Sequence, residues 1–219
     1  MKIIKPYHEI IDEPAKDFVI YYLEKTARVC YKSESKIKEN SATPLLRSLF
    51  KNGHHSIFEH VSFSTRIICD RGISHELVRH RHCTFSQEST RYANYSKHKF
   101  NREITVIKPF FFSEGSDSYI LWYNSMKFSE QAYLSLIEKG ASPQEARSVL
   151  PNSLKTELIM TANLREYLHI LTLRCSPKAH PQMREIMIPL LENIYEFAPF
   201  MFKDLYNIYK RKDSTKKEI

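Results

Sequence analysis

The segment at residues 79–92, RHRHCTFSQESTRY, gathers cations, hydroxyl groups and imidazoles in one short stretch. Arg79, Arg81 and Arg91 carry planar guanidinium groups that can hold a phosphate or a polarised carbonyl through paired hydrogen bonds. The serine and threonine hydroxyls and a glutamine amide can add hydrogen bonds to the edge of a heterocycle. An arginine-rich loop alone is more often a solvated basic surface, but this combination predicts a nucleotide site.

The order of these residues is more specific than their composition. Arg79-His80-Arg81, seven further residues and then Ser89 resemble the RHR-x7-S signature of the flavin-dependent thymidylate synthases, the ThyX family. Three more segments resemble the same family in the same order. They are GHHSIFEH at residues 53–60, EARSVLP at 145–151, and NLR at 163–165 with its continuation to Leu173-Arg174.

The resemblance implies a reaction as well as a fold. That reaction is the reductive methylation of dUMP to dTMP, with methylenetetrahydrofolate as carbon donor and FAD, reduced by NADPH, as hydride carrier. The partners would be the small molecules dUMP, folate and NADPH. The resemblance also implies a homotetramer with active sites shared between subunits. Because the flavin carries the hydride, the protein mainly binds, orients and polarises, and no protein nucleophile is required.

The resemblance further assigns roles to individual residues. Arg174 is implied to be catalytic, as a fixed cation that stabilises negative charge on uracil by about 3 kcal/mol, by analogy with oxyanion-hole donors. The implied dUMP-binding residues are Glu76, Leu77, Val78, Arg79, Gln87, Glu88, Ser89, Thr90, Arg91, Arg147 and Arg174. The implied FAD-binding residues are Ser56, Arg79, His80, Arg81, Gln87, Asn163, Leu164, Arg165 and His169. Phosphate would go to Arg91 and Arg147, and His54 would position the folate.

Some of these residues have simpler alternative roles. Arg174 could satisfy carbonyl groups at a helix C-terminus, and Asn163 and Ser56 could cap helices. A different enzyme would use Cys83 as a nucleophile activated by the cationic groups around it. Ser89 has no evident base beside it, so a hydrolase-type nucleophile is rejected.

A non-enzyme alternative is a basic RNA- or DNA-binding module, with bases stacked on Tyr92, Tyr95 and Phe100. The net charge of +8 permits a polyanionic partner, and the segment from Arg66 to Arg102 holds eight basic and three acidic residues. Small phosphorylated ligands satisfy the same charge, so with the resemblance we expect no nucleic-acid partner.

We expect neither a metal site nor a Rossmann turn. The segment His75–Arg79 departs from the zincin motif because its fifth position is arginine. His80, His82 and Cys83 lack further ligands at zinc spacing, and the neighbouring arginines would repel a cation. The chain has four glycines, each at least nineteen positions from the next, so no GxGxxG or Walker loop exists.

The composition predicts one domain in a reducing, non-membrane location. A chain of 219 residues with 42% apolar residues can bury a sizeable core, and we expect a single domain over residues 1–219. No apolar stretch is as long as a membrane span, and residues 1–13 carry acids where a signal peptide needs an apolar run. We therefore expect a cytoplasmic protein. Its four scattered cysteines should be reduced thiols.

Hydrophobic periodicity predicts an α+β fold, with helices packed around a mixed or antiparallel sheet. The expected helices are 14–30, a helix from Ser41 or Thr43 to Gly53, Ser74 to Arg81, 118–139, one starting at Ser142, one starting at Asn163, and 181–210 interrupted or kinked at Pro189 and Pro199. The expected strands are 61–67, 103–108 and 155–162, with a turn at 70–72. Residues 82–90 are expected to form the substrate loop, and 211–219 a frayed tail.

Overall fold

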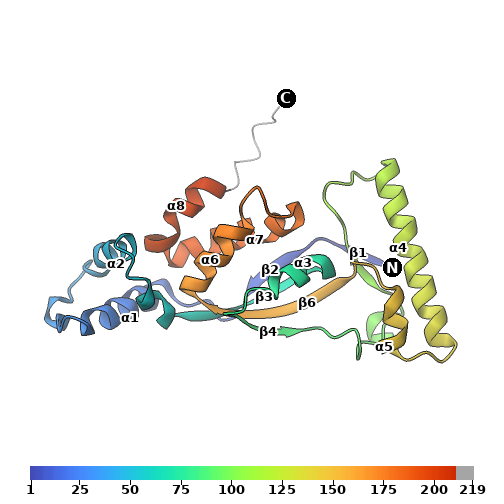
Figure 1. Ribbon diagram of the computed structural model, residues 1–219, viewed down its shortest axis with the longest axis horizontal. Coiled ribbons are helices and arrows are strands. Elements are labelled where there is room, and N and C mark those ends of the chain that lie inside the picture. Colours follow the sequence, from blue (N-terminus) through green and yellow to red (C-terminus); the bar gives the residue numbers. More distant parts are fainter. Residues whose placement is uncertain (211–219) are drawn as a thin grey trace. The chain divides into compact units, whose positions relative to one another are not determined.

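Strands are interspersed with runs of helices along the chain, as the ribbon of the computed structural model shows (Figure 1). The structure describes residues 1–210, so the expected tail at 211–219 lies outside the described residues. One two-stranded sheet pairs β1 (Lys2–Ile4) in parallel with β5 (Thr105–Ile107). A four-stranded sheet has the order β2 (Tyr7–Ile10), β3 (Ser62–Asp70), β6 (Lys155–Asn163) and β4 (Thr84–Gln87). Parallel and antiparallel strands occur together with helices, which confirms the predicted α+β class.

The described chain divides into two compact units, called here the first and the second unit. The first unit comprises Met1–Glu9 and Arg66–Met160, and the second comprises Ile10–Thr65 and the residues from Thr161 onward. Strands β3 and β6 each contribute residues to both units.

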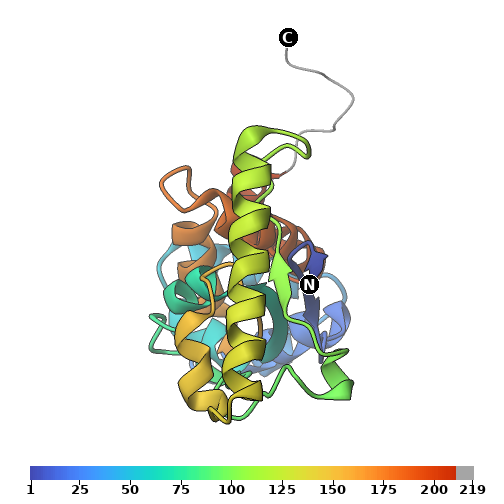
Figure 2. The same cartoon turned by 90° about the vertical axis from the view of Figure 1, so that its right-hand side faces the viewer.

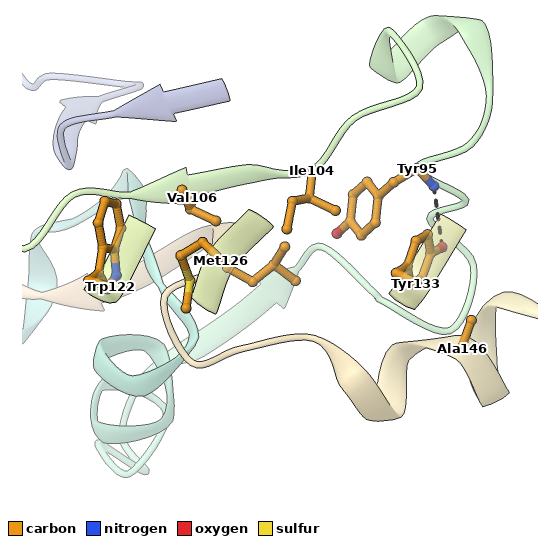
Figure 3. Close-up of a cluster of buried hydrophobic side chains, with 8 residues drawn as sticks. Tyr95, Ile104, Val106, Trp122, Met126, Tyr133 and Ala146 are labelled. Carbon is orange, nitrogen blue, oxygen red and sulfur yellow. Dashed lines mark hydrogen bonds between the residues drawn. The ribbon is translucent and has the colours of Figure 1, made fainter. Parts of the chain in front are cut away.

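The long helix α4 (Asp117–Glu138) dominates the first unit and runs without a break (Figure 2). It begins where Ser116 Oγ accepts a hydrogen bond from the backbone N–H of Tyr119 at 3.2 Å, and Gly140 lies just beyond its end with φ +93°. The helix expected at 118–139 is confirmed. Its inner face packs into a cluster of buried side chains (Figure 3), which comprises Tyr95, Ile104, Val106, Trp122, Met126, Tyr133, Ala146 and Leu154.

Two short elements follow α4 in the first unit. A capping box starts α5 (Pro143–Ala146), because the Glu145 carboxylate accepts hydrogen bonds from the Ser142 N–H at 2.8 Å and from its hydroxyl at 2.6 Å. The expected capping box is therefore confirmed. The helix itself is shorter than its start suggested, because a 3-10 turn, η4 (Arg147–Val149), takes over at once. A second 3-10 turn, η3 (His98–Phe100), lies earlier in the unit.

The second unit is mostly helical. The helices are α1 (Lys16–Val29), α2 (Ala42–Lys51), α6 (Leu164–Arg174), α7 (Pro181–Phe197) and α8 (Pro199–Tyr209), and the 3-10 turns are η1 (Glu34–Lys36) and η2 (His55–His60). Helix α7 contacts both α6 and α8, and α2 contacts both α1 and α8 (Figure 1). Helix α7 continues through Pro189 and ends before Ala198, and Pro199 starts the next helix.

The region after β3 differs from the sequence-based expectation. The expected turn at 70–72 is the start of a helix, α3 (Arg71–Leu77), and Asp70 caps it by accepting the Ile73 N–H at 2.8 Å. Ser74, expected to be the cap, instead donates its hydroxyl to the Arg71 carbonyl inside the helix at 2.9 Å. Asp70 is the cap because it lies directly at the end of strand β3 with an extended backbone, the geometry that a capping residue adopts. The helix ends at Leu77, before Arg79, and not near Arg81 as expected.

Strand pairing explains two further differences. Residues 82–90 were expected to be a loop, yet 84–87 pair as β4 in the four-stranded sheet. Strand β1 is three residues long, too short for a periodic signal, and it exists because it pairs in register with β5. Strand β4 pairs with β6, and β1 pairs with β5, so each partner strand is distant in the sequence.

Two other expectations concern the whole chain. None of the four cysteines takes part in a disulfide, as expected for reduced thiols. Among residues 1–210, no helix combines the length and the apolar character needed to cross a bilayer.

The core of the second unit allows a stability test. The Tyr167 ring stacks on Phe63 with 4.1 Å between ring centroids, and its hydroxyl lies 2.8 Å from that of the fully buried Thr65. In Tyr167→Phe, Thr65 loses this partner, and we expect the free energy of unfolding to fall by about 1–3 kcal/mol. Urea denaturation at fixed protein concentration measures it. Tyr31→Phe is the control, because Tyr31 is 79% exposed and should change stability by less than about 0.5 kcal/mol. Equal effects of the two changes would contradict the role given to the hydroxyl pair.

Candidate functional site

The first unit brings together two residues of the predicted dUMP site, Thr90 and Arg147. Arg147 follows α5 directly, and its Nη1 donates to Thr90 Oγ1 at 3.4 Å although the two residues are 57 positions apart. Both line a cavity of about 480 Å³. The other lining residues are Arg71, His75, Gln144, Ser148, Leu150, Pro151, Asn152 and Leu154. None of these described lining residues is acidic, so the cavity, called here the basic cavity, is suited to an anion.

Arg71 and His75 were missed as site residues by the sequence analysis. Both lie on α3, four positions apart, and therefore on one side of the helix. The Arg71 backbone N–H also donates to the carbonyls of Asn152 and Leu154, at 2.9 and 3.1 Å. These bonds join the start of α3 to the segment that follows Arg147. With a turn expected at 70–72, Arg71 and His75 were not placed on one helix. A helix expected to start at Asp70 would have placed them one turn apart.

Earlier in the signature, the side chains of Gln87 and Glu88 form hydrogen bonds within the protein. Gln87 Nε2 donates to Ser74 Oγ at 2.9 Å and to Thr156 Oγ1 at 3.1 Å. The Glu88 carboxylate accepts from Lys155 Nζ at 2.8 Å and from the Tyr95 hydroxyl at 3.1 Å. Burial, together with the negative charge of Glu88, raises the pKa of Tyr95, so its phenol keeps the proton that it donates.

A second cavity of the first unit, of about 570 Å³, lies beside Ser89. Polar and basic side chains share it with aromatic ones: Ser86, Gln87, Glu88, Ser89, Tyr92, Ala93, Lys99, Phe100, Lys155, Glu157 and Ile159. The Ser89 hydroxyl accepts the Arg91 N–H at 3.3 Å and so helps to turn the chain after the signature serine.

The buried position of Tyr95 counts against the nucleic-acid alternative. Tyr92 is 78% exposed, but Tyr95 is only 5% exposed and packs against the ring of Phe100. It also lies beside Tyr133 (Figure 3). Its backbone N–H also donates to the Tyr133 hydroxyl at 3.3 Å. Tyr95 is a core residue of the first unit and cannot stack on a base.

The residues at the end of α3 and in the signature that follows it differ in accessibility. Arg79, Arg81 and Arg91 are exposed, as a binding role for their guanidinium groups requires. Glu76 is half-buried and Val78 is exposed. Leu77 is fully buried and His80 is 5% exposed. The side chain of Leu77 thus belongs to the core, and only its backbone is left for a ligand.

In the second unit, the start of α6 is organised by the residues predicted to contact FAD. The Asn163 side chain caps the helix by accepting the Glu166 N–H at 2.9 Å, which is the simpler of its two predicted roles. Leu164 is fully buried and donates its N–H to the Val61 carbonyl at 2.9 Å. Arg165 and His169 are exposed one turn apart, and Arg165 forms an ion pair with Glu59. Arg174 is the last residue of the same helix.

The residues before β3 line a third cavity, of about 780 Å³ in the second unit. Ser56 belongs to η2 and lines this cavity, and because the N-cap of η2 is His54, Ser56 is not the capping residue. Aromatic side chains of α1 line the same cavity: Phe18, Tyr21 and Tyr22. His54 is exposed.

Comparison with known proteins places these features in a family. A family model described as thymidylate synthase complementing protein matches residues 18–200. The flavin-dependent thymidylate synthase of Geobacter sulfurreducens is 33% identical over 185 residues, covering 81% of this chain and 78% of the relative. That of Mycobacterium sp. (strain JLS) is 32% identical over 215 residues, covering 88% and 82%. That of Pyrococcus furiosus is 34% identical over 163 residues, covering 74% and 66%. The chain belongs to the family of the flavin-dependent thymidylate synthases.

Proposed function

We infer that the protein is a flavin-dependent thymidylate synthase that converts dUMP to dTMP, with methylenetetrahydrofolate as carbon donor and NADPH-reduced FAD as hydride carrier. Family membership supports the reaction class. The observation that carries the substrate is the basic cavity, where Arg147 meets Thr90 of the signature segment among neutral and basic side chains. An acid-free cavity of this kind is suited to the phosphate dianion of a nucleotide.

We propose that the dUMP phosphate lies in the basic cavity. Arg147 and Thr90 would bind it directly, with Arg91 nearby in the sequence as a further cation. Arg71 and His75 line the same cavity and would add to the positive potential. The Ser89 hydroxyl would lie near the pyrimidine. Glu76, Leu77, Val78 and Arg79 remain proposed contacts, Leu77 through its backbone because its side chain is buried.

FAD fits the donor groups that the chain presents. Its pyrophosphate requires cations and hydrogen-bond donors, and Arg79, Arg81 and Arg165 are exposed guanidinium groups. When bound, FAD supplies the transfer of hydride from NADPH to the one-carbon group. The residues proposed to hold it are Ser56, Arg79, His80, Arg81, Gln87, Asn163, Leu164, Arg165 and His169.

The contacts already made within the protein narrow how some of these residues would act. Asn163 uses its side-chain oxygen as a helix cap, so it would contribute by placing Arg165 and His169 at the start of α6. Gln87 donates its amide to Ser74 and Thr156, which leaves its oxygen as an acceptor. His54 would position the folate, and its exposed ring supports this role.

Arg174 would stabilise negative charge on the uracil during the reaction. A guanidinium group stays charged at all working pH values, so it can act on developing charge without a proton transfer. Its place at the C-terminus of α6 also suits the simpler role of satisfying carbonyl groups. Activity separates these two roles.

We further propose a cytoplasmic homotetramer with shared active sites, in which each chain is one domain. The family match at residues 18–200 includes parts of both units, which supports a single functional domain. Phe18 and Tyr21 of α1 are 59% and 56% exposed in the single chain, and such aromatic side chains favour a covered face. The absence of disulfides fits a reducing compartment.

Replacing Arg174 by alanine tests the catalytic assignment. We expect kcat for dTMP formation to fall by about 100-fold to 1000-fold, the usual loss when one donor to a developing charge is removed. The measurement is an anaerobic assay with FAD, NADPH, dUMP and methylenetetrahydrofolate. Arg47→Ala, an exposed arginine of α2 outside the proposed site, should keep full activity. Unchanged turnover in Arg174→Ala, with flavin still bound, would leave only the helix-end role.

Replacing Arg147 or Arg71 by alanine tests the phosphate site. Each change should raise the Kd for dUMP by about tenfold to 100-fold, because a charge-assisted hydrogen bond contributes about 1.5–3 kcal/mol. Binding of deoxyuridine, which lacks the phosphate, should change little. Titration of both ligands by calorimetry measures the difference, with Lys97→Ala as the control for loss of an exposed cation. Equal weakening of both ligands would argue against phosphate in the basic cavity.

Replacing Cys83 by alanine separates the flavin mechanism from a cysteine-nucleophile mechanism. We expect dTMP formation to continue at a rate within about twofold of the unmodified protein, because no protein nucleophile is needed. The same anaerobic assay measures it. Loss of turnover in a folded, flavin-containing variant would support the nucleophile alternative.

A further inference from the structure

We propose that Lys155 is a positioning residue for dUMP binding, and that it acts by pairing with Glu88 at the base of the substrate segment. Glu88 is then an anchor for this segment and not a ligand of dUMP. The inference rests on the proposed function, because the segment that it positions, residues 87–91, is the one proposed to bind dUMP.

Glu88 is held at three points. Carboxylate Oε2 accepts from Lys155 Nζ at 2.8 Å, and Oε1 accepts from the Tyr95 hydroxyl at 3.1 Å. The backbone N–H of Glu88 donates to the Glu157 carbonyl at 2.8 Å. Both carboxylate oxygens and the backbone of Glu88 are therefore engaged by the protein itself. Ser89, Thr90 and Arg91 follow without a break, so their starting point is fixed.

Side chains on both faces of strand β6 hold this segment in place. Along β6 the side chains alternate, with Lys155 and Glu157 half-buried and Thr156 between them only 1% exposed. Lys155 binds Glu88 on one face, while the Thr156 hydroxyl accepts from the Gln87 amide on the other. Two consecutive residues of the segment are thus joined to two consecutive residues of one strand.

The Lys155–Glu88 pair is shielded enough to matter. The Lys155 side chain is 22% exposed and that of Glu88 is 19% exposed, so water screens the pair less than it screens a surface pair. Lys155 also lies 3.4 Å from Glu157, whose own carboxylate accepts from Arg66 Nε at 2.7 Å. The hydrogen bond from Arg66 holds the pKa of Glu157 below its usual value, so Glu157 stays charged and also fixes the ammonium group.

Charge explains why Lys155 should affect substrate affinity. Without Lys155, the Glu88 carboxylate would be left partly buried with only the Tyr95 hydroxyl as partner. An uncompensated negative charge would then lie two residues before Thr90, which is proposed to bind the phosphate dianion. Both the looser segment and the added repulsion weaken binding of dUMP. Neither effect removes a group that acts on the uracil itself.

The test is steady-state kinetics of Lys155→Met. We expect KM for dUMP to rise about tenfold, as for a shielded pair that loses one partner, and kcat to stay within about twofold. Lys155→Arg should restore KM, and the exchanged pair Glu88→Lys with Lys155→Glu should recover part of it. Lys108→Met is the matched control, because Lys108 pairs with Glu114 in the same unit outside the segment and should leave KM unchanged.

Hydrogen–deuterium exchange supplies a readout that needs no turnover. Peptides covering 87–91 should exchange faster in Lys155→Met, but not in Lys108→Met. Lys155→Gln, which keeps a hydrogen-bond donor without the charge, is measured in parallel should the methionine variant not fold. If the Lys155 variants keep the KM for dUMP and the exchange rate of the unmodified protein, the proposal is overturned. A wild-type protein that forms no dTMP would overturn the proposed function instead, and exchange alone would then decide whether the anchor exists.

Discussion

Like charges repel, and a site for a phosphorylated ligand has to hold cations close together without neutralising them. In the first unit, backbone hydrogen bonds and helix caps hold Arg71 and Arg147 beside the basic cavity. Asp70 starts α3, the Arg71 N–H binds two carbonyls of the segment after Arg147, and a capping box starts the turn that carries Arg147 itself. The described lining of the basic cavity includes no acidic side chain, and the carboxylates of Asp70 and Glu145 are engaged as helix caps.

Two acidic residues beside the signature, Glu157 of strand β6 and Glu88 of the segment that β6 holds, lie outside the lining of the basic cavity. Glu157 and Glu88 alternate with Arg66 and Lys155 in a chain of ion pairs. Each carboxylate in this chain is matched by a cation, so the network carries little charge towards a ligand while it fixes the backbone. Within one signature, the Gln87 amide and the Glu88 carboxylate make contacts inside the protein, whereas the Arg91 guanidinium group is exposed.

The second unit prepares its residues differently. Asn163 caps α6, Leu164 is buried, and the exposed Arg165 and His169 follow at the spacing of one helical turn. One short motif thus contains both residues that build the helix and residues whose side chains are exposed. Motif matching treats them alike, whereas burial and hydrogen bonding separate them.

The sequence by itself determined the family, because four ordered motifs carry side-chain chemistry that composition alone does not specify. It also determined helix α4, the capping box at Ser142 and the start of α6, since these depend on residues within one or two turns of each other. Only the tertiary structure decided that 84–87 is a strand, that Asp70 and not Ser74 starts α3, and that Arg71 and His75 share a cavity with Arg147. The strand and the shared cavity depend on partners 13 to 76 positions away, such as Thr156 for Gln87 or Arg147 for Arg71, and local propensity contains no information about such partners. The Asp70 cap joins residues only three positions apart, but it depends on where strand β3 ends.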